Sequence, residues 1–176
     1  MMEFAVRLAG TDDVPALVSL VNSAYRGESS RAGWTTEADL LGGQRVDEAG
    51  IVEMLDRPGN AILIYAPAPA PTACVHLERT GNDAYLGMLT VQPTQQRGGI
   101  GRQLLEAAER WALEHWGSRA IHMTVIAQRP ELIAWYERRG YRRTGTHKAF
   151  PYGDARFGLP KHDDLVFEVL HKPLAR

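Results

Sequence analysis

The stretch from Leu89 to Arg102 constrains the fold of this chain more than any other part of it. An apolar run typical of a strand ends at Pro93, and a short polar loop follows. Gly98, Gly99 and Gly101 then open an amphipathic helix. The first turn of a helix carries unpaired backbone N–H groups and the positive end of the helix dipole. Because glycine has no Cβ to keep an anion away, this stretch predicts a phosphate or pyrophosphate site at the helix start.

Two other interpretations of these glycines have to be weighed. They are compatible with a flexible turn that merely precedes a core helix, because short glycine motifs recur by chance. A nucleotide-binding module is disfavoured, since no Gly-Lys-Ser or Gly-Lys-Thr follows the loop. The preceding strand also belongs to an antiparallel meander, without the parallel unit and ribose-binding acid of a dinucleotide fold.

Hydrophobic periodicity divides the chain into strands and helices. Alternation or compact apolar runs predict strands at 4–8, 61–65, 72–79, 84–91, 121–125, 141–147 and 165–170. Helical spacing and end signals predict helices at 11–25, 47–57, 100–116 and 130–140. This order is typical of an α/β (α+β) fold, with a mixed, mostly antiparallel sheet of about seven strands flanked by about four helices. No linker is visible, so we expect residues 1–176 to form one domain.

Composition excludes several classes of function. The net charge of −1 gives no global field that would favour nucleic acid or an anionic membrane. Cys74 is the only cysteine, so an internal disulfide and a cysteine-based zinc site are excluded, and the histidine spacings do not suggest a metal site. No signal peptide and no apolar run of the ~20 residues needed to span a bilayer is visible. We therefore expect a cytoplasmic protein.

Two motifs resemble those of a known family. Gln96-Arg97-Gly98-Gly99-Ile100-Gly101 fits the acetyl-CoA signature of the GNAT superfamily of N-acetyltransferases, Gln/Arg-x-x-Gly-x-Gly/Ala. The segment from Ala134 to Tyr141 is similar to the second family signature, a helix that ends in Tyr-x-x-x-Gly-Phe/Tyr. The motifs occur in the family's order and spacing, and the resemblance covers nearly the whole chain.

The resemblance implies an acetyl-CoA site. The pyrophosphate would lie on the backbone amides from Arg97 to Arg102, and the pantetheine arm would lie beside the central strand, where that strand separates from 121–126. Arg129 stands where relatives commonly carry asparagine, so its side chain either contacts the cofactor or turns to solvent. The implied cofactor-binding residues are Leu89, Thr90, Val91, Gln96, Arg97, Gly98, Gly99, Ile100, Gly101, Arg102, Arg129 and Tyr136.

The implied reaction is acyl transfer to an amine, which requires a neutral amine, an acceptor for its proton and a donor to the departing sulfur. The resemblance assigns Tyr136 as general acid, although an aromatic residue at helical spacing can also simply pack against the sheet. No acid lies on 85–91, so the base is open. Glu37 is one candidate, Glu78 and His122 are others, and a water relay would need none of them.

Two irregular segments place aromatic and acidic residues in long loops, where acceptor specificity usually resides. Trp34, Glu37, Tyr152 and Asp154 are the candidate acceptor-binding residues, and they would suit a cationic amine of a small molecule or peptide. These loops could instead cover the sheet or form a homodimer contact. A non-catalytic acyl-CoA-binding or regulatory module is the alternative function.

Overall fold

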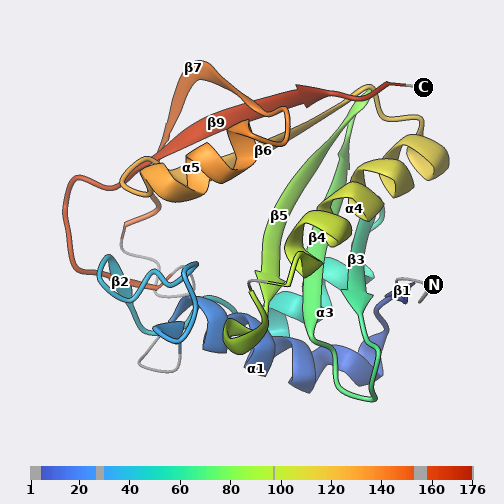
Figure 1. The fold of residues 1–176 in the computed structure, drawn as a ribbon, viewed down its shortest axis with the longest axis horizontal. Helices are drawn as coiled ribbons and strands as arrows, with labels where there is room; N and C mark the ends of the chain where they lie inside the picture. The colour runs from blue at the N-terminus through green and yellow to red at the C-terminus, as the bar shows by residue number, and fades with distance from the viewer. Residues whose placement is uncertain (1–4, 27–29, 97, 153–157, 176) are drawn as a thin grey trace.

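A seven-stranded mixed sheet forms the centre of the computed structural model, which describes residues 5–26, 30–96, 98–152 and 158–175 (Figure 1). The strand order is β1-β3-β4-β5-β6-β9-β7. The bounds are β1 Val6–Leu8, β3 Asn60–Tyr65, β4 Ala73–Thr80, β5 Asp83–Val91, β6 Ala120–Ile126, β7 Arg142–Ala149 and β9 Val166–Pro173. Only β5 and β6 pair in parallel among these described strands, so the predicted mostly antiparallel sheet is confirmed.

Four α-helices in the described residues cover the two faces of this sheet. They are α1 Val14–Tyr25, α3 Glu48–Asp56, α4 Ile100–Trp116 and α5 Pro130–Glu137. The apolar residues of α1 and α3 pack in one core, and those of α4 and α5 pack in another on the opposite face (Figure 1). None of the helices in the described ranges is long and apolar enough to cross a membrane.

The helix ends follow local chemistry. The Asp47 carboxylate accepts a hydrogen bond from Gly50 N at 2.7 Å and so caps α3. Gly117 ends α4 in the left-handed conformation with φ 63°. Pro130 begins α5, where its missing N–H costs no helical hydrogen bond. These three signals explain why the predicted helix bounds and the observed ones agree within a few residues.

A second, two-stranded sheet joins the two segments that the sequence indicates as irregular. β2 Leu41–Gly42 pairs antiparallel with β8 Leu159–Pro160. Lys161 adds to this pairing, because its N–H donates to Leu40 O at 2.8 Å and its Nζ donates to Ala38 O at 2.6 Å. Local periodicity cannot predict such a pairing, since the two short strands are far apart in the chain.

The central strand β5 changes direction near its end. Met88 has φ 56°, and the pairing of β4 with β5 shifts register between Cys74 and His76. This is the geometry of a β-bulge. β5 pairs with β6 only at Ala84–Ile121 and Tyr85–His122. The last part of β5 therefore has an edge that β6 does not cover, in line with the separation of strands that the resemblance implied.

Candidate active site

Two cavities meet at the uncovered end of β5. The larger has a volume of about 550 Å³ and extends along the face of the sheet that α1 and α3 cover. The smaller, of about 200 Å³, lies between the start of α4 and α5. Their linings share Tyr25, Leu89, Leu132 and Tyr136. These four residues form the shared wall, which is the place where molecules bound in the two cavities would touch.

The smaller cavity contains an uncapped helix start. Gly99 is the N-cap residue of α4 and has φ 79°, so it offers no side-chain cap, and the first turn contains no acid. A Cβ built at Gly99 would meet nothing within 4 Å, so there is open space beside the first N–H groups. Arg102 adds a positive charge to the lining. The residues here therefore fit a pyrophosphate, while Arg97 lies outside the described residues.

The Gln96 side chain, in the lining of this cavity, forms hydrogen bonds to the loop that follows α1. Its Oε1 accepts from Trp34 N at 2.8 Å and from Thr35 N at 3.3 Å. Its Nε2 donates to Thr35 Oγ1 at 2.6 Å and to Val91 O at 3.0 Å. The side chain that the resemblance assigned to the cofactor thus joins the end of β5 to the 34–35 backbone.

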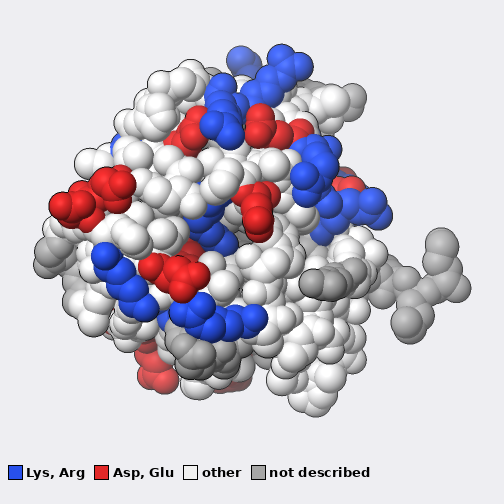
Figure 2. Space-filling model, turned by 60° about the vertical axis from the view of Figure 1, so that its left-hand side comes forward, with Lys and Arg blue, Asp and Glu red and all other residues white. Residues whose placement is uncertain are grey.

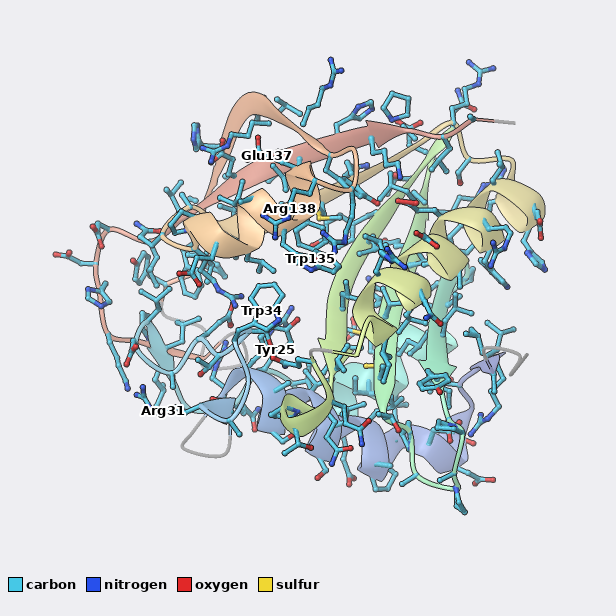
Figure 3. The ribbon with its side chains drawn as sticks, in the orientation of Figure 1. Tyr25, Arg31, Trp34, Trp135, Glu137 and Arg138 are labelled. Atoms are coloured by element: carbon cyan, nitrogen blue, oxygen red, sulfur yellow. The ribbon has the colours of Figure 1, made fainter. Side chains whose placement is uncertain are left out.

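Two tryptophans line the smaller cavity and contact one another. The ring centroids of Trp34 and Trp135 are 6.1 Å apart, and Figure 3 shows Trp34 between Tyr25 and Trp135. The guanidinium of Arg139 covers Trp135 at 3.8 Å from its ring centroid. Trp34 lines the smaller cavity and not the larger one, so the structure places it on the side of the helix start.

Tyr136 lies in the shared wall with its hydroxyl free. The residue is 6% exposed, and its ring packs edge-on against Trp135 and Tyr141. Within the described part of the chain, the hydroxyl has no hydrogen-bond partner. Burial raises the pKa of Tyr136 well above its usual range, so the group stays protonated. A hydroxyl in this position can donate a hydrogen bond to a ligand in either cavity.

Hydrogen bonds from three side chains hold the backbone of 88–91. The Tyr25 hydroxyl donates to Leu89 O, and the Thr90 hydroxyl donates to Met88 O at 2.9 Å. Gln96 holds Val91 O, as described above. The strand end beside Tyr136 is therefore fixed although β6 does not pair with it.

A buried ion cluster closes one end of the larger cavity. Glu37 is 8% exposed, and its Oε1 pairs with Arg26 Nη1 while its Oε2 pairs with Arg129 Nη1 at 3.0 Å. Arg129 Nη2 also donates to Thr35 O at 2.5 Å. The side chain of Arg129 therefore turns inward to Glu37. From the sequence we considered a contact with the cofactor or an orientation into solvent. The buried pair with Glu37 is neither of these.

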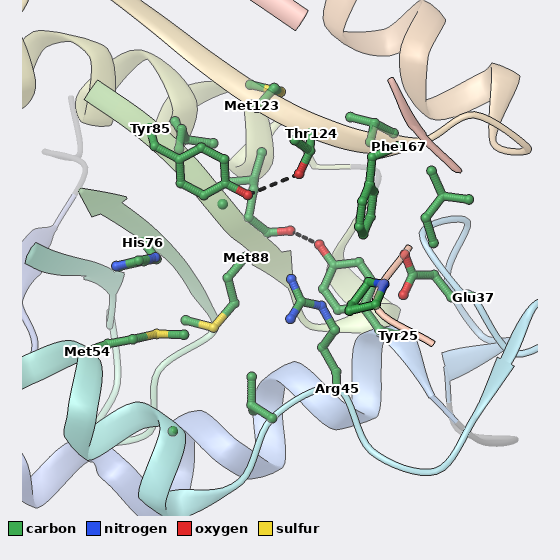
Figure 4. Close-up of a pocket in the computed structure, with 18 of the residues that line it drawn as sticks. Tyr25, Glu37, Arg45, Met54, His76, Tyr85, Met88, Met123, Thr124 and Phe167 are labelled. Carbon is green, nitrogen blue, oxygen red and sulfur yellow. Dashed lines mark hydrogen bonds between the residues drawn. The ribbon is translucent and has the colours of Figure 1, made fainter. Parts of the chain in front are cut away.

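Further titratable and aromatic groups line the larger cavity (Figure 4). The ring of His76 bonds to Asn60 Oδ1 at 2.6 Å, and the Tyr85 hydroxyl lies 3.1 Å from Thr124 Oγ1. Glu78 also belongs to the lining, whereas His122 lies outside it, with its ring tilted against that of Tyr85. On the face shown in Figure 2, acidic and basic side chains alternate around a hollow, without a field of one sign.

Some residues important to these cavities are absent from the sequence-based candidates, and some candidates lie elsewhere. Tyr152 is 44% exposed and lines neither cavity, because its hydroxyl bonds to His162 O at 2.9 Å within its own loop. Asp154 lies outside the described residues. Tyr25 and Arg45 were not singled out, because Tyr25 fits the apolar face of a helix and Arg45 precedes a helix with no local motif.

Comparisons with known proteins agree with this architecture. The sequence model of the acetyltransferase (GNAT) family matches residues 21–141. No curated protein matches the chain by sequence. A ribosomal-protein-alanine N-acetyltransferase from Brucella melitensis is similar in structure, with a TM-score of 0.70 and 22% identity, covering 97% of this chain and 99% of that one. An N-acetyltransferase from Staphylococcus aureus Mu50 gives a TM-score of 0.72 at 11% identity, covering 98% and 99%.

A third solved structure bears on the donor. A Bacillus anthracis protein, proposed to be a streptothricin acetyltransferase, was solved in complex with acetyl coenzyme A. It gives a TM-score of 0.57 at 20% identity, covering 69% of this chain and 66% of that one. Acetyl-CoA is the donor that the family uses. The sequence match, supported by the shared fold, shows that this chain belongs to the GNAT acetyltransferase family.

Proposed function

We propose that this protein transfers an acetyl group from acetyl-CoA to the primary amine of a small molecule or to an exposed amino group, by direct attack in a ternary complex. The observation that supports it most is the meeting of two cavities at Tyr136 and Leu89. One cavity ends at a helix start that fits a pyrophosphate, and the other has room for an acceptor.

The donor would be held from both ends of the smaller cavity. The N–H groups of Gly99, Ile100, Gly101 and Arg102 would bind the pyrophosphate, and the edge of β5 at 89–91 would bind the pantetheine arm by main-chain pairing. Bound acetyl-CoA supplies a thioester carbonyl that an amine can attack. The chain's own task is to hold that carbonyl at the shared wall, beside an acceptor in the larger cavity.

Tyr136 would act as the general acid. Its hydroxyl has no partner in the described residues and lies in the shared wall, beside the position that we propose for the departing sulfur. Because burial keeps the hydroxyl protonated, it is available to donate as negative charge develops on sulfur. The attacking amine releases one proton, and this proton replaces the one that Tyr136 donates to sulfur. The transfer therefore consumes no acid overall.

The base was left open by the sequence, and the ion cluster bears on Glu37. Both of its oxygens already face buried guanidinium groups, so protonating it would remove the negative charge that Arg26 and Arg129 share. We therefore infer that Glu37 positions Arg129 and, through it, the backbone of Thr35. Water in the larger cavity would then take the proton of the attacking amine. Glu37 is also compensated in charge, so it offers little to a cationic acceptor.

Turnover of acetyl-CoA against a panel of primary amines, followed by thiol release, tests the proposal. Tyr136→Phe should lower kcat by about 100-fold or more while changing the KM for acetyl-CoA much less. Tyr65→Phe is the matched control, because it removes a hydroxyl outside both cavities. Full activity of Tyr136→Phe would refute the role as acid. Tight CoA binding without thiol release from any amine would instead favour a non-catalytic acyl-CoA-binding module.

A further inference from the structure

One guanidinium group in the larger cavity has no acidic partner among the described residues. Arg26 and Arg129 pair with Glu37, and Arg57 Nη2 pairs with Glu53 at 2.5 Å. The Arg45 side chain, by contrast, forms neither an ion pair nor a hydrogen bond with any described group. It is only partly exposed. A partly buried charge without a partner is unfavourable, so it is uncommon unless a ligand completes it.

The position of Arg45 is fixed by a side chain of α1. Asn22 Oδ1 accepts from Arg45 N at 2.7 Å and from Val46 N at 3.1 Å, and Asn22 Nδ2 donates to Val46 O at 2.9 Å. Three hydrogen bonds thus hold the backbone of 45–46 against α1. The guanidinium points into the larger cavity beside Met88 and Tyr25 (Figure 4).

Arg45 lies close to the shared wall. Its Cζ is 5.8 Å from the ring centroid of Tyr25. The Tyr25 hydroxyl bonds to Leu89 O, so a single side chain separates Arg45 from the part of β5 where transfer is proposed. A group bound by Arg45 would therefore lie only a few bonds from an amine at the shared wall.

The other titratable groups of this cavity leave the charge of Arg45 uncompensated. Asp47, two residues further along the chain, is engaged in capping α3. Burial lowers the pKa of His76 to about 4, with further lowering by Arg57 and Arg45, so His76 is neutral at pH 7. Glu78 pairs in register with Tyr85, near the start of β5. It therefore lies away from Met88 and Leu89, the part of β5 that is close to Arg45.

We propose that Arg45 binds a carboxylate of the acceptor, so that the acceptor class is an amine that carries a carboxylate a few bonds away, as in an α-amino acid. The proposal rests on the function proposed above. The planar fork of a guanidinium matches a carboxylate with two parallel hydrogen bonds. A polyamine would instead bring a second positive charge next to Arg45. The same guanidinium accounts for both preferences.

The first experiment uses the unmodified protein. Acetyl transfer is compared for free α-amino acids, for their carboxamides and for the corresponding amines without a carboxyl group. We expect kcat/KM for the free amino acids to exceed that for the carboxamides by about 10-fold or more, through KM. Equal use of all three series would overturn the proposal, and it would leave the transferase function standing.

The second experiment changes the arginine. Arg45→Gln should raise the KM for the amino acids by about 10- to 100-fold and leave the carboxamides and the KM for acetyl-CoA nearly unchanged. Arg79→Gln is the matched control, because Arg79 is an exposed arginine of β4 that lines neither cavity. An equal loss for both acceptor series in Arg45→Gln would overturn the assignment.

A binding measurement separates this proposal from the proposed function. Calorimetric titration of the wild-type protein with an amino acid and with its carboxamide, in the presence of CoA, requires no turnover. If no acceptor releases thiol but the amino acid binds at least about 10-fold tighter than its carboxamide, the transferase proposal fails and the Arg45 site stands. If the amino acid and its carboxamide bind equally well, the Arg45 site fails. This conclusion does not depend on whether Arg45→Gln folds, because only the wild-type protein is used.

Discussion

Replacing Glu37 with glutamine keeps the size of a side chain that is 8% exposed but removes the charge that two guanidinium groups share. Arg26 and Arg129 would remain buried at 4% and 9% exposure with a neutral amide between them. The amide could still accept a hydrogen bond, but its NH₂ would face one of the two donors. Removing one partner of a buried ion pair typically costs about 3–5 kcal/mol.

The lower end of that range applies here, because glutamine retains one acceptor oxygen and Thr35 O still accepts from Arg129. For a chain of this size, about 3 kcal/mol corresponds to a Tm lower by about 6–12 °C. Thermal unfolding followed by circular dichroism measures the shift, and urea unfolding gives the free energy directly. Both are run at the same pH and ionic strength.

Asp39→Asn is the matched control, since it removes a carboxylate from the same loop. Asp39 pairs with Arg31 at 2.9 Å, but the two side chains are 79% and 40% exposed, so the change should stay within about 0.5 kcal/mol. If Glu37→Gln melts within about 2 °C of the wild type, the ion cluster does not support the loop. A large loss of kcat with unchanged stability would restore Glu37 as the base.

Three further predictions concern separate parts of the molecule. Burial, Arg57 and Arg45 lower the pKa of His76 from 6.5 to about 4, so the unfolded chain binds more protons than the folded one between these values. As pH falls through this window, the free energy of unfolding of the wild type should therefore fall by about 3 kcal/mol more than that of His76→Gln, as measured by urea unfolding. Burial raises the pKa of the Cys74 thiol to about 12, so a thiol reagent should modify Cys74 only in the unfolded protein, and rapid labelling of the native protein would contradict its burial. Gly99→Val should weaken CoA binding at least about 10-fold in calorimetry. Gly81→Val is the control, since Gly81 also has positive φ and open space but lies in the β4–β5 turn; an equal effect of both changes would exclude the phosphate site.

The elements of the fold could be predicted because their signals are local. The cap at Asp47, the stop at Gly117 and the proline at 130 each act within one turn of a helix. Alternation of apolar residues or compact apolar runs likewise indicated the strands of the main sheet. The β2–β8 pair was missed because each strand has only two residues, which is too short for any periodicity.

The contacts of the cavities were harder to predict, since they join residues far apart in the sequence. Arg129 and Glu37 are separated by 92 residues, and Gln96 reaches back 62 residues to Trp34. Nothing near Arg129 in the sequence shows that its charge is used inside the protein. The same holds for Arg45. Its proposed role rests on the lack of an acidic partner among the described residues, which no local motif indicates. The motifs predict the donor side, and the acceptor side is proposed from the three-dimensional arrangement.

The shared wall also bears on which acyl groups the protein can transfer. In the proposed arrangement the acyl group lies at this wall, where Tyr25, Leu89, Leu132 and Tyr136 line both cavities, so a chain longer than acetyl would extend beyond it. Its extra carbons would extend past Leu89 into the larger cavity, where we propose that the amine binds. Long-chain thioesters would therefore occupy both sites at once, and a single such molecule would exclude the donor and the acceptor together.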